Sequence, residues 1–313
     1  MKNNSFSTHF IDKASAVRIN QDWIIGQLKN PSTRIIPVWQ MKVLCKSNDY
    51  QQPVFLSAKD FNEKSTQTDT YLFLGLAEGK AFFAYPIYYE EDAVRLRQKE
   101  SNEFLDFRKV APIISYKNYT LLALARFMVN WNSRHTFCGK CGHITNVLEG
   151  GNARICSNEA CKENFYPSMD PAVIVLVTSG DKCLLGSQSK WLKGLYSTIA
   201  GFVEPGESIE NAVYREVEEE TGIRIDNLQY QSSQPWLFPS SLMLGFNAKA
   251  INKKIVINKD ELDDARWFTR EEIRDQLKNG KMKMPMKVSI AYSLIKTWYE
   301  QGDLGKLDEV ITS

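Results

Sequence analysis

The sequence predicts an α/β protein with more than one domain, and three observations support this prediction. The chain has 313 residues, about twice the length of a common domain. Runs of β-branched and apolar residues, such as 172–177, are followed by segments rich in helix-forming residues, such as 207–221. Four of the six cysteines lie between Cys138 and Cys161, a density that predicts a metal-stabilised module. We therefore expect a β-rich N-terminal domain with a connecting helix over 1–133, a zinc-binding module over 134–167 and an α/β domain over 168–313.

Composition and charge exclude several classes of protein. Hydrophobic residues make up 43% of the chain and charged residues 24%, so a globular fold with a real core is expected. The 39 basic and 37 acidic residues leave a net charge of +2, so no overall field draws the chain to nucleic acid or anionic lipid. No apolar run reaches the roughly 18 residues of a membrane span, and we expect no membrane partner.

The cysteine usage also bears on the compartment. Paired cysteines without a secretory signal predict a reducing compartment rather than a disulfide framework. We expect a cytoplasmic location, with the peroxisome and the mitochondrion as alternatives, although the C-terminus has no ending of the Ser-Lys-Leu type.

The first 133 residues predict short strands followed by helices. Between 34 and 89, alternating apolar runs such as 71–76 and 81–85 are separated by polar and glycine-containing turns. The charged segment 91–108 predicts a surface helix. Apolar residues in 119–131 have the spacing of an amphipathic helix, which leads into the cysteine cluster.

The cysteine cluster consists of two close pairs. Cys138 and Cys141 are separated by two residues, and Cys156 and Cys161 by four. Two turns of this kind point four thiolates at one centre, so the pattern predicts a zinc ribbon with one structural Zn²⁺ per chain. Four protein ligands leave no coordination position for a substrate. The alternative is four unrelated buried thiols, as we expect for Cys45 and Cys183, which should be small apolar core residues.

After the cysteines the pattern predicts strands at 172–177 and 182–186, then a helix over 207–221 that ends at Gly222. Further strands are expected at 228–231 and 242–250. Later helices are expected at 270–278 and 286–300.

The segment between Gly201 and Gly222 has seven glutamates and one arginine, a local charge of −6. On a helix, Glu216, Glu219 and Glu220 project from one face, where like charges repel each other. A bound cation removes this repulsion, and carboxylate oxygens in an open cluster suit Mg²⁺ or Mn²⁺ held together with substrate phosphates. The alternative interpretation is a solvated acidic helix.

The complete pattern around this helix resembles the Nudix box. Gly201, Glu207 and the run Arg-Glu-Val-Glu-Glu-Glu-Thr-Gly-Ile over 215–223 match every defined position of that motif. The chain is therefore similar to the Nudix hydrolases, and the resemblance implies an α/β/α sandwich with a mixed sheet. It implies that Glu216, Glu219 and Glu220 bind catalytic divalent ions and that Glu219 or Glu220 helps to deprotonate the attacking water. The implied supporting groups are Arg215, which pairs with Glu207, and the backbone carbonyl of Ala200, which contacts the metal.

Three further features resemble the NADH pyrophosphatase subfamily. The segment Ser-Gln-Pro-Trp-Leu-Phe-Pro-Ser-Ser over 233–241 is similar to its signature, with Leu237 in place of a proline. A zinc ribbon directly precedes the Nudix segment, and 260–268 and 289–295 look like the subfamily's C-terminal segments. In these, Glu261 matches a metal-binding position and Ala291 a substrate-contacting one. The resemblance and the residue chemistry together suggest the following substrate contacts: Tyr166, Phe202, Gln234, Pro235, Trp236, Leu237, Phe238, Pro239, Ser240, Ser241 and Ala291.

The resemblance implies hydrolysis of the pyrophosphate bond of NADH to reduced nicotinamide mononucleotide and AMP. NAD, NADPH and the NAD-capped 5′ end of RNA contain the same bond and are further candidate substrates. One alternative is a Nudix hydrolase acting on ADP-ribose or another nucleoside diphosphate derivative. A second alternative is a non-catalytic zinc-ribbon RNA-binding protein. A homodimer is expected on the resemblance alone.

Overall fold

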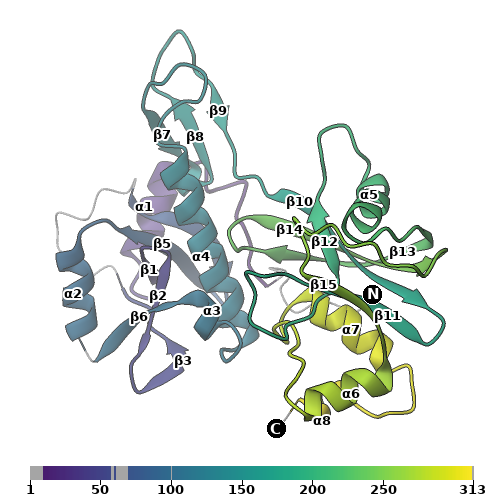
Figure 1. The fold of residues 1–313 in the computed structure, drawn as a ribbon. Helices are drawn as coiled ribbons and strands as arrows, with labels where there is room; N and C mark the ends of the chain where they lie inside the picture. The colour runs from purple at the N-terminus through teal and green to yellow at the C-terminus, as the bar shows by residue number, and fades with distance from the viewer. Residues whose placement is uncertain (1–9, 58–59, 61–69, 100, 312–313) are drawn as a thin grey trace. The chain divides into compact units, whose positions relative to one another are not determined.

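The structure is a computed structural model that describes residues 10–57, 60, 70–99 and 101–311. It divides into two compact units (Figure 1). The N-terminal unit includes the cysteine segment, extends to Ser168 and also contains Leu237–Ser240. The C-terminal unit contains Met169–Trp236 and the residues from Ser241 onward. Domain boundaries after residues 133 and 167 stay predictions.

The N-terminal unit is built on one mixed sheet, which confirms the expected β-rich domain. Its strands are β1 (Arg34–Trp39), β2 (Lys42–Lys46), β3 (Asp49–Pro53), β4 (Leu72–Ala77), β5 (Lys80–Ile87) and β6 (Asn102–Asp106). The order is β3-β2-β1-β5-β4, and β6 pairs with β2. Strands β1 and β5 are parallel, and the other pairs are antiparallel. The helices are α1 (Gln21–Lys29), α2 (Glu90–Gln98), α3 (Phe107–Val110) and α4 (Tyr116–Arg134).

The expected helix over 91–108 is wrong in its second half. Helix α2 ends at Gln98, and the chain then forms β6, which pairs antiparallel with β2. The side-chain amide of Asn102 donates to the carbonyls of Leu96 and Lys99 and so closes the end of the helix. Phe104 and Leu105 are buried in the sheet. The charged residues of 91–99 favoured a helix locally, but burial of the following apolar residues decides the strand.

The cysteine segment forms a small three-stranded sheet in the order β7-β8-β9. Its elements are β7 (Thr145–Leu148), the short 3₁₀ helix η4 (Glu149–Gly151), β8 (Ala153–Cys156) and β9 (Asn164–Phe165). Gly150 and Gly151 have positive φ and lie against β4, where a Cβ at Gly151 would be 2.5 Å from the Cδ2 atom of Leu72. Glycine is therefore needed at this contact.

The C-terminal unit is an α/β/α sandwich, as expected. Its strands are β10 (Asp170–Ser179), β11 (Lys182–Ser187), β12 (Ile199–Phe202), β13 (Ile225–Trp236), β14 (Ser241–Ala250) and β15 (Asp264–Thr269). The sheet order is β13-β14-β10-β11-β15, with β12 paired to β10. Strand β10 is parallel to β14 and antiparallel to β11 and β12, so the sheet is mixed.

Helices cover both faces of this sheet (Figure 1). They are α5 (Ile209–Thr221), α6 (Arg270–Lys278), α7 (Ile290–Tyr299) and α8 (Leu307–Val310). Alternate residues of β10 supply both cores, because Val173 and Val175 pack with α5 while Ile174 and Leu176 pack with α7. Helix α7 begins later than the expected 286, since the Ser289 hydroxyl caps it by accepting from the Tyr292 amide.

The two large sheets share one topology. The path β6-β2-β1-β5-β4 corresponds strand for strand to β15-β11-β10-β14-β13, with the same parallel pair at the centre. A short helix follows β6 directly, just as α6 follows β15. The described part of the N-terminal unit has no counterpart of α5, so the acidic helix distinguishes the two sheets.

Among the described residues, no helix is both long enough and apolar enough to cross a bilayer.

Candidate functional site

Helix α5 presents the acidic residues from a firmly defined frame. The Ser208 hydroxyl caps its first turn by accepting from the Asn211 amide, and Gly222 ends it in the left-handed conformation at φ 66°. Ala212, Val213 and Val217 are buried against the sheet. The apolar face therefore fixes the rotation of the helix and the direction in which its glutamates project.

Arg215 is the centre of an ion-pair network. Its Nε and Nη2 atoms bind both carboxylate oxygens of Glu207, at 2.6 and 2.9 Å. Its Nη1 atom binds Glu216 at 2.9 Å and Glu219 at 3.1 Å, and Nη2 also donates to the Phe202 carbonyl at 2.9 Å. The Arg215 hydrogen bonds, together with the Glu204 amide, lower the pKa of Glu207 to about 2. The arginine thus ties the loop before α5 to two glutamates of the expected metal site.

Glu216 is buried directly against the backbone of β12. A Cβ built on Gly201 would lie 1.9 Å from the Glu216 Cδ atom, so only glycine leaves room for this carboxylate. Burial raises the pKa of Glu216, and Arg215 opposes that shift. Ala200, the residue before Gly201, pairs with Ile174 in the ladder between β12 and β10.

The remaining carboxylates lie around Glu216. Glu220 is buried, and burial together with the charges of Glu216 and Glu261 raises its pKa to about 8. Glu219 and Glu261 are exposed. Repulsion between neighbouring carboxylates favours a bound cation, and hard carboxylate oxygens suit Mg²⁺ or Mn²⁺. Their ligand atoms are not drawn into a compact group, since Glu219 is turned toward Arg215.

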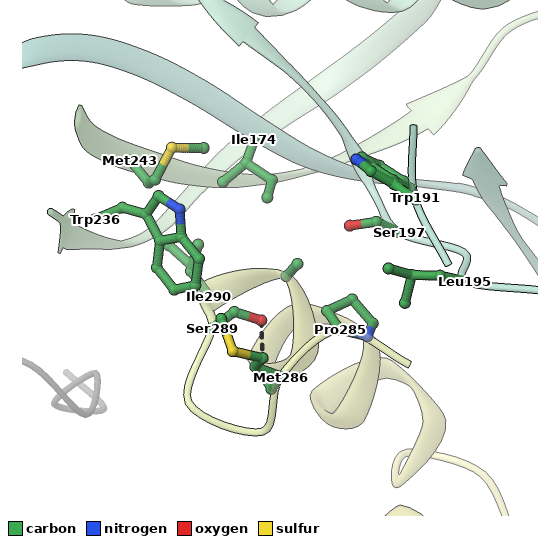
Figure 2. A pocket seen from close by; sticks show the side chains of 11 residues that line it. Ile174, Trp191, Leu195, Ser197, Trp236, Met243, Pro285, Met286, Ser289 and Ile290 are labelled. Carbon is green, nitrogen blue, oxygen red and sulfur yellow. Dashed lines mark hydrogen bonds between the residues drawn. The ribbon is translucent and has the colours of Figure 1, made fainter. Parts of the chain in front are cut away.

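A cavity of about 320 Å³ opens on the α7 face of the same sheet. Figure 2 shows Trp236 and Trp191 on opposite sides of it, with Ile174 from the sheet between them and Met243 next to Trp236. Ala291, at the start of α7, also lines it. An apolar slot between two indole rings is suited to a flat ring of a ligand.

Sequence reasoning missed several lining residues of this cavity. Trp191, Leu195 and Ser197 come from the segment between β11 and β12, and Pro285 and Met286 come from the segment before α7. Neither segment has a periodic pattern. The tryptophan itself was the available signal, because an indole in an irregular segment needs a partner or a ligand.

Gln234 has a supporting position next to the cavity. It is buried, its amide nitrogen donates to the Val288 carbonyl at 2.8 Å, and its amide oxygen accepts from the Ile290 amide at 2.6 Å. Both polar atoms of the Gln234 side-chain amide therefore hold the backbone at the start of α7. Pro235 and Ser241 are paired in the ladder between β13 and β14, with Leu242 and Trp236 respectively.

Four predicted substrate residues are not among the residues that line the cavity, and their role at the substrate stays a prediction. These four, Leu237, Phe238, Pro239 and Ser240, belong to the N-terminal unit. The Phe238 ring stacks on Phe107 with centroids 5.4 Å apart and planes at 20°, and the Arg126 guanidinium lies 5.4 Å from the Phe238 centroid.

Two predicted aromatic contacts are exposed. Phe202 is 59% exposed at the end of β12, and Tyr166 is 64% exposed at the end of the cysteine segment. Tyr166 belongs to the N-terminal unit, and the cavity is lined entirely by residues of the C-terminal unit.

The four cysteines of the ribbon form a compact sulfur cluster. Cys138, Cys141, Cys156 and Cys161 have Sγ atoms within 4.8 Å of one another. Tetrahedral Zn²⁺ with Zn–S bonds of about 2.3 Å places its sulfurs about 3.8 Å apart, so the cluster fits a structural zinc. The turn at Cys138 is closed by the Gly142 amide, which donates to the Cys138 carbonyl at 2.8 Å. Cys45 and Cys183 are buried elsewhere, as expected for small apolar residues.

Family models match three consecutive parts of the chain. A model described as the NADH pyrophosphatase-like rudimentary NUDIX domain matches residues 32–131. The NADH pyrophosphatase zinc ribbon domain matches 133–166, and the NUDIX domain matches 169–287.

Curated relatives match most of the chain. The NAD-capped RNA hydrolase NUDT12 of Macaca fascicularis is 35% identical over 337 residues, covering 94% of this chain and 73% of the relative. The NAD-capped RNA hydrolase NudC of Stutzerimonas stutzeri (strain A1501) is 37% identical, covering 76% of this chain and 80% of the relative. The mitochondrial NAD(P)H pyrophosphatase NUDT13 of Mus musculus is 38% identical, covering 63% and 59%. With its acidic helix, its four-sulfur cluster and these relatives, the chain belongs to the Nudix hydrolase family, in the branch that carries the NADH pyrophosphatase zinc ribbon.

Proposed function

We propose that this protein hydrolyses the pyrophosphate bond of NADH and of NAD-capped RNA 5′ ends. One observation carries the proposal beyond the names of the relatives. Ile174 of β10 lines the cavity that Trp191 and Trp236 share, which we call the two-tryptophan cavity, and Ile174 pairs with Ala200 of β12. The residue after Ala200 is Gly201, which contacts the Glu216 carboxylate on the opposite face of the sheet. A ring-binding slot and a carboxylate cluster thus flank one short strand, as a ring-bearing pyrophosphate requires.

The residues assigned to the divalent metal are Glu216, Glu219, Glu220 and Glu261, with the Ala200 carbonyl. When bound, Mg²⁺ or Mn²⁺ neutralises pyrophosphate oxygens and lowers the pKa of a water. Arg215 holds Glu216 and Glu219 in place through its hydrogen bonds. Glu219 or Glu220 accepts the proton of the attacking water as its oxygen bonds to phosphorus. The bridging P–O bond breaks, and from NADH the products are reduced nicotinamide mononucleotide and AMP.

The walls of the cavity determine which part of the substrate enters it. Trp191 and Trp236 offer indole faces, and Met243 and Ile174 add apolar walls from the sheet. We assign this slot to a planar ring of the dinucleotide, with the ring stacked on an indole and the pyrophosphate directed to the glutamates.

The assignment of the glutamates is tested by single amide substitutions. Glu219→Gln and Glu220→Gln should each lower kcat for NADH with Mg²⁺ or Mn²⁺ by at least about 100-fold, as expected for loss of a metal ligand or general base. Glu218→Gln is the matched control, because Glu218 is exposed on the same helix and is not assigned to the metal. Unchanged turnover in both Glu219→Gln and Glu220→Gln would contradict the assignment.

The substrate is tested by comparing kcat/KM for NADH, NAD, NADPH, ADP-ribose and an NAD-capped RNA. The proposal expects NADH or the capped RNA to rank first. ADP-ribose lacks the nicotinamide ring, so a first rank for ADP-ribose would favour the alternative Nudix activity. RNA binding without cleavage of any of these compounds would favour a non-catalytic protein.

Two further assignments concern assembly and compartment, the first from the family resemblance and the second from the cysteine usage. We propose a homodimer, which light scattering coupled to gel filtration would detect as twice the mass of the chain. We also propose a cytoplasmic location, to be tested by cell fractionation; the name of one relative specifies the mitochondrion.

A further inference from the structure

Another cavity, of about 370 Å³ and with a polar lining, lies on the α7 face of the C-terminal sheet. It shares no lining residue with the two-tryptophan cavity. The two-tryptophan cavity is lined by the first residues of α7, and this one by Trp298 near its last turn. The ten residues of α7 span about 15 Å, so the two cavities lie at opposite ends of the helix. We call the second one the α7 C-terminal pocket.

Two neighbouring strands supply its floor. Leu176 pairs with Asn247 and Thr178 with Lys249 in the parallel ladder between β10 and β14, and all four residues line the pocket. The Asn247 side-chain oxygen is buried and has no hydrogen-bond partner among the described residues. A buried acceptor without a partner is unfavourable, so this position is suited to a ligand that donates a hydrogen bond, such as the P–OH group of a protonated phosphate.

Arg270 supplies a fixed positive charge at the wall. Its Nε and Nη2 atoms donate to the Trp298 carbonyl at 3.2 and 3.0 Å, and the guanidinium lies 4.1 Å from the Trp298 ring centroid. Gly302 makes room for it, since a Cβ there would lie 2.5 Å from the Arg270 Cδ atom. The cation is therefore held in one orientation before any ligand arrives.

No acidic side chain lines this pocket, although Asp226 pairs with Lys249 in the ladder between β13 and β14. Within the part of the chain that the structure describes, neither Arg270 nor Lys249 forms a salt bridge. Asn227 and Gln229 add further amide groups at the rim. Two cations and several amides around one cavity are the donor set that binds phosphate oxygens.

We propose that the α7 C-terminal pocket binds a phosphate group whose charged oxygens accept from Arg270 and Lys249 and whose P–OH group donates to the side-chain oxygen of Asn247. The ligand class is inorganic phosphate or the phosphomonoester of a mononucleotide. The site is separate from the metal-binding glutamates and goes beyond the hydrolysis proposed above.

The test is a calorimetric titration of the full zinc-containing chain, without added Mg²⁺ or Mn²⁺, using inorganic phosphate and AMP as probes. The wild type should show one saturable site. Lys249→Gln and Asn247→Val should weaken binding by about tenfold or more, as expected for loss of a hydrogen bond to a charged group. Lys254→Gln is the matched control, since this exposed lysine does not line the pocket. Tighter binding of AMP than of phosphate would identify a mononucleotide site, and the reverse would identify a site for the free ion.

Folding and function are checked separately. Asn247→Val removes an unpartnered buried oxygen, so its unfolding temperature should equal or exceed that of the wild type while phosphate binding is weakened. Turnover of NADH by Lys249→Gln in phosphate-free buffer should match the wild type, which separates this site from the hydrolytic one. Absence of saturable binding to the wild type, or equal affinity in Lys249→Gln, Asn247→Val and Lys254→Gln, would overturn the proposal.

Discussion

The carboxylate of Glu216 rests on the backbone of Gly201, at a place where a single added methyl group would lie 1.9 Å from the Glu216 Cδ atom. The first glycine of the acidic motif therefore makes room for a proposed metal ligand. A side chain there must displace either β12 or the glutamate.

Gly201→Ala should lower kcat/KM for NADH by about 100-fold, since a displacement near 1 Å has an effect of that size on a positioned catalytic group. Circular dichroism should show a folded protein, because Glu216 lies at the edge of the α5 core. Gly26→Ala is the control, as a Cβ added at Gly26 would have no neighbouring atom within 4 Å. Full activity in Gly201→Ala would mean that Glu216 is not needed where the structure places it.

The pair between Glu207 and Arg215 predicts a pH dependence of stability. The folded pKa of Glu207, about 2, lies below the roughly 4.3 of an unfolded glutamate. A carboxyl group whose pKa is lower in the folded protein than in the unfolded chain stabilises the folded state at pH values above the unfolded pKa. This stabilisation is lost as the pH falls toward 2. The free energy of unfolding should therefore be higher for the wild type than for Glu207→Gln at pH 6, and the difference should shrink toward pH 3. Denaturant titrations at both values measure it.

Glu210→Gln is the control for this comparison, because Glu210 is exposed in the first turn of the same helix. The Glu207→Gln variant should also lose about 10–100-fold in kcat, the usual effect of removing a group that orients a metal ligand. A wild-type advantage that stays constant from pH 6 to pH 3 would rule out the ion pair as its source.

The sulfur cluster predicts one zinc per chain. Cys141→Ser should abolish zinc binding, measured by mass spectrometry of the metal, and should lower the unfolding temperature of the N-terminal unit. Cys45→Ser should retain the zinc, because Cys45 is a core residue of the N-terminal sheet rather than a member of the cluster. Equal zinc content in these two variants would contradict the ribbon assignment.

Trp191 is expected to bind a substrate ring from the wall opposite Trp236. Trp191→Ala should raise KM for NADH about tenfold, as expected for loss of an aromatic contact of about 1.5 kcal/mol, and should change kcat little. Trp191→Phe should recover most of the loss. Steady-state kinetics of the two variants test this, and an unchanged KM in Trp191→Ala would remove the residue from the site.

Local patterns were enough to predict the acidic helix. Glu216, Glu219 and Glu220 lie on one helix, and the glycine that ends it is nearby in sequence, so spacing alone predicts the helix and its three glutamates. The zinc ligands are also close in sequence, and their pairing was predictable for the same reason. The assignment of roles to the individual glutamates stays a prediction.

Features that depend on distant pairing were not predicted. The local pattern favours a helix where β6 forms, because the partner strand, β2, lies more than fifty residues earlier. Trp191 and Met243 line one cavity although they are distant in sequence, because the strands next to or containing them, β12 and β14, both pair with β10. The stacking of Phe238 on Phe107 was likewise not predicted, while the expected role of Phe238 at the substrate stays a prediction. Contact between residues so far apart depends on the whole sheet order, which no local pattern contains.

The anchoring of Phe238 also bears on how the protein can be divided experimentally. A recombinant fragment starting at Met169 would keep the hairpin of β13 and β14 but lose Phe107 and Arg126, which contact its tip at Phe238 and the Leu237 carbonyl. That tip would then expose an aromatic ring, which favours self-association. Engineering a minimal catalytic fragment therefore calls for a redesigned polar turn at 237–240.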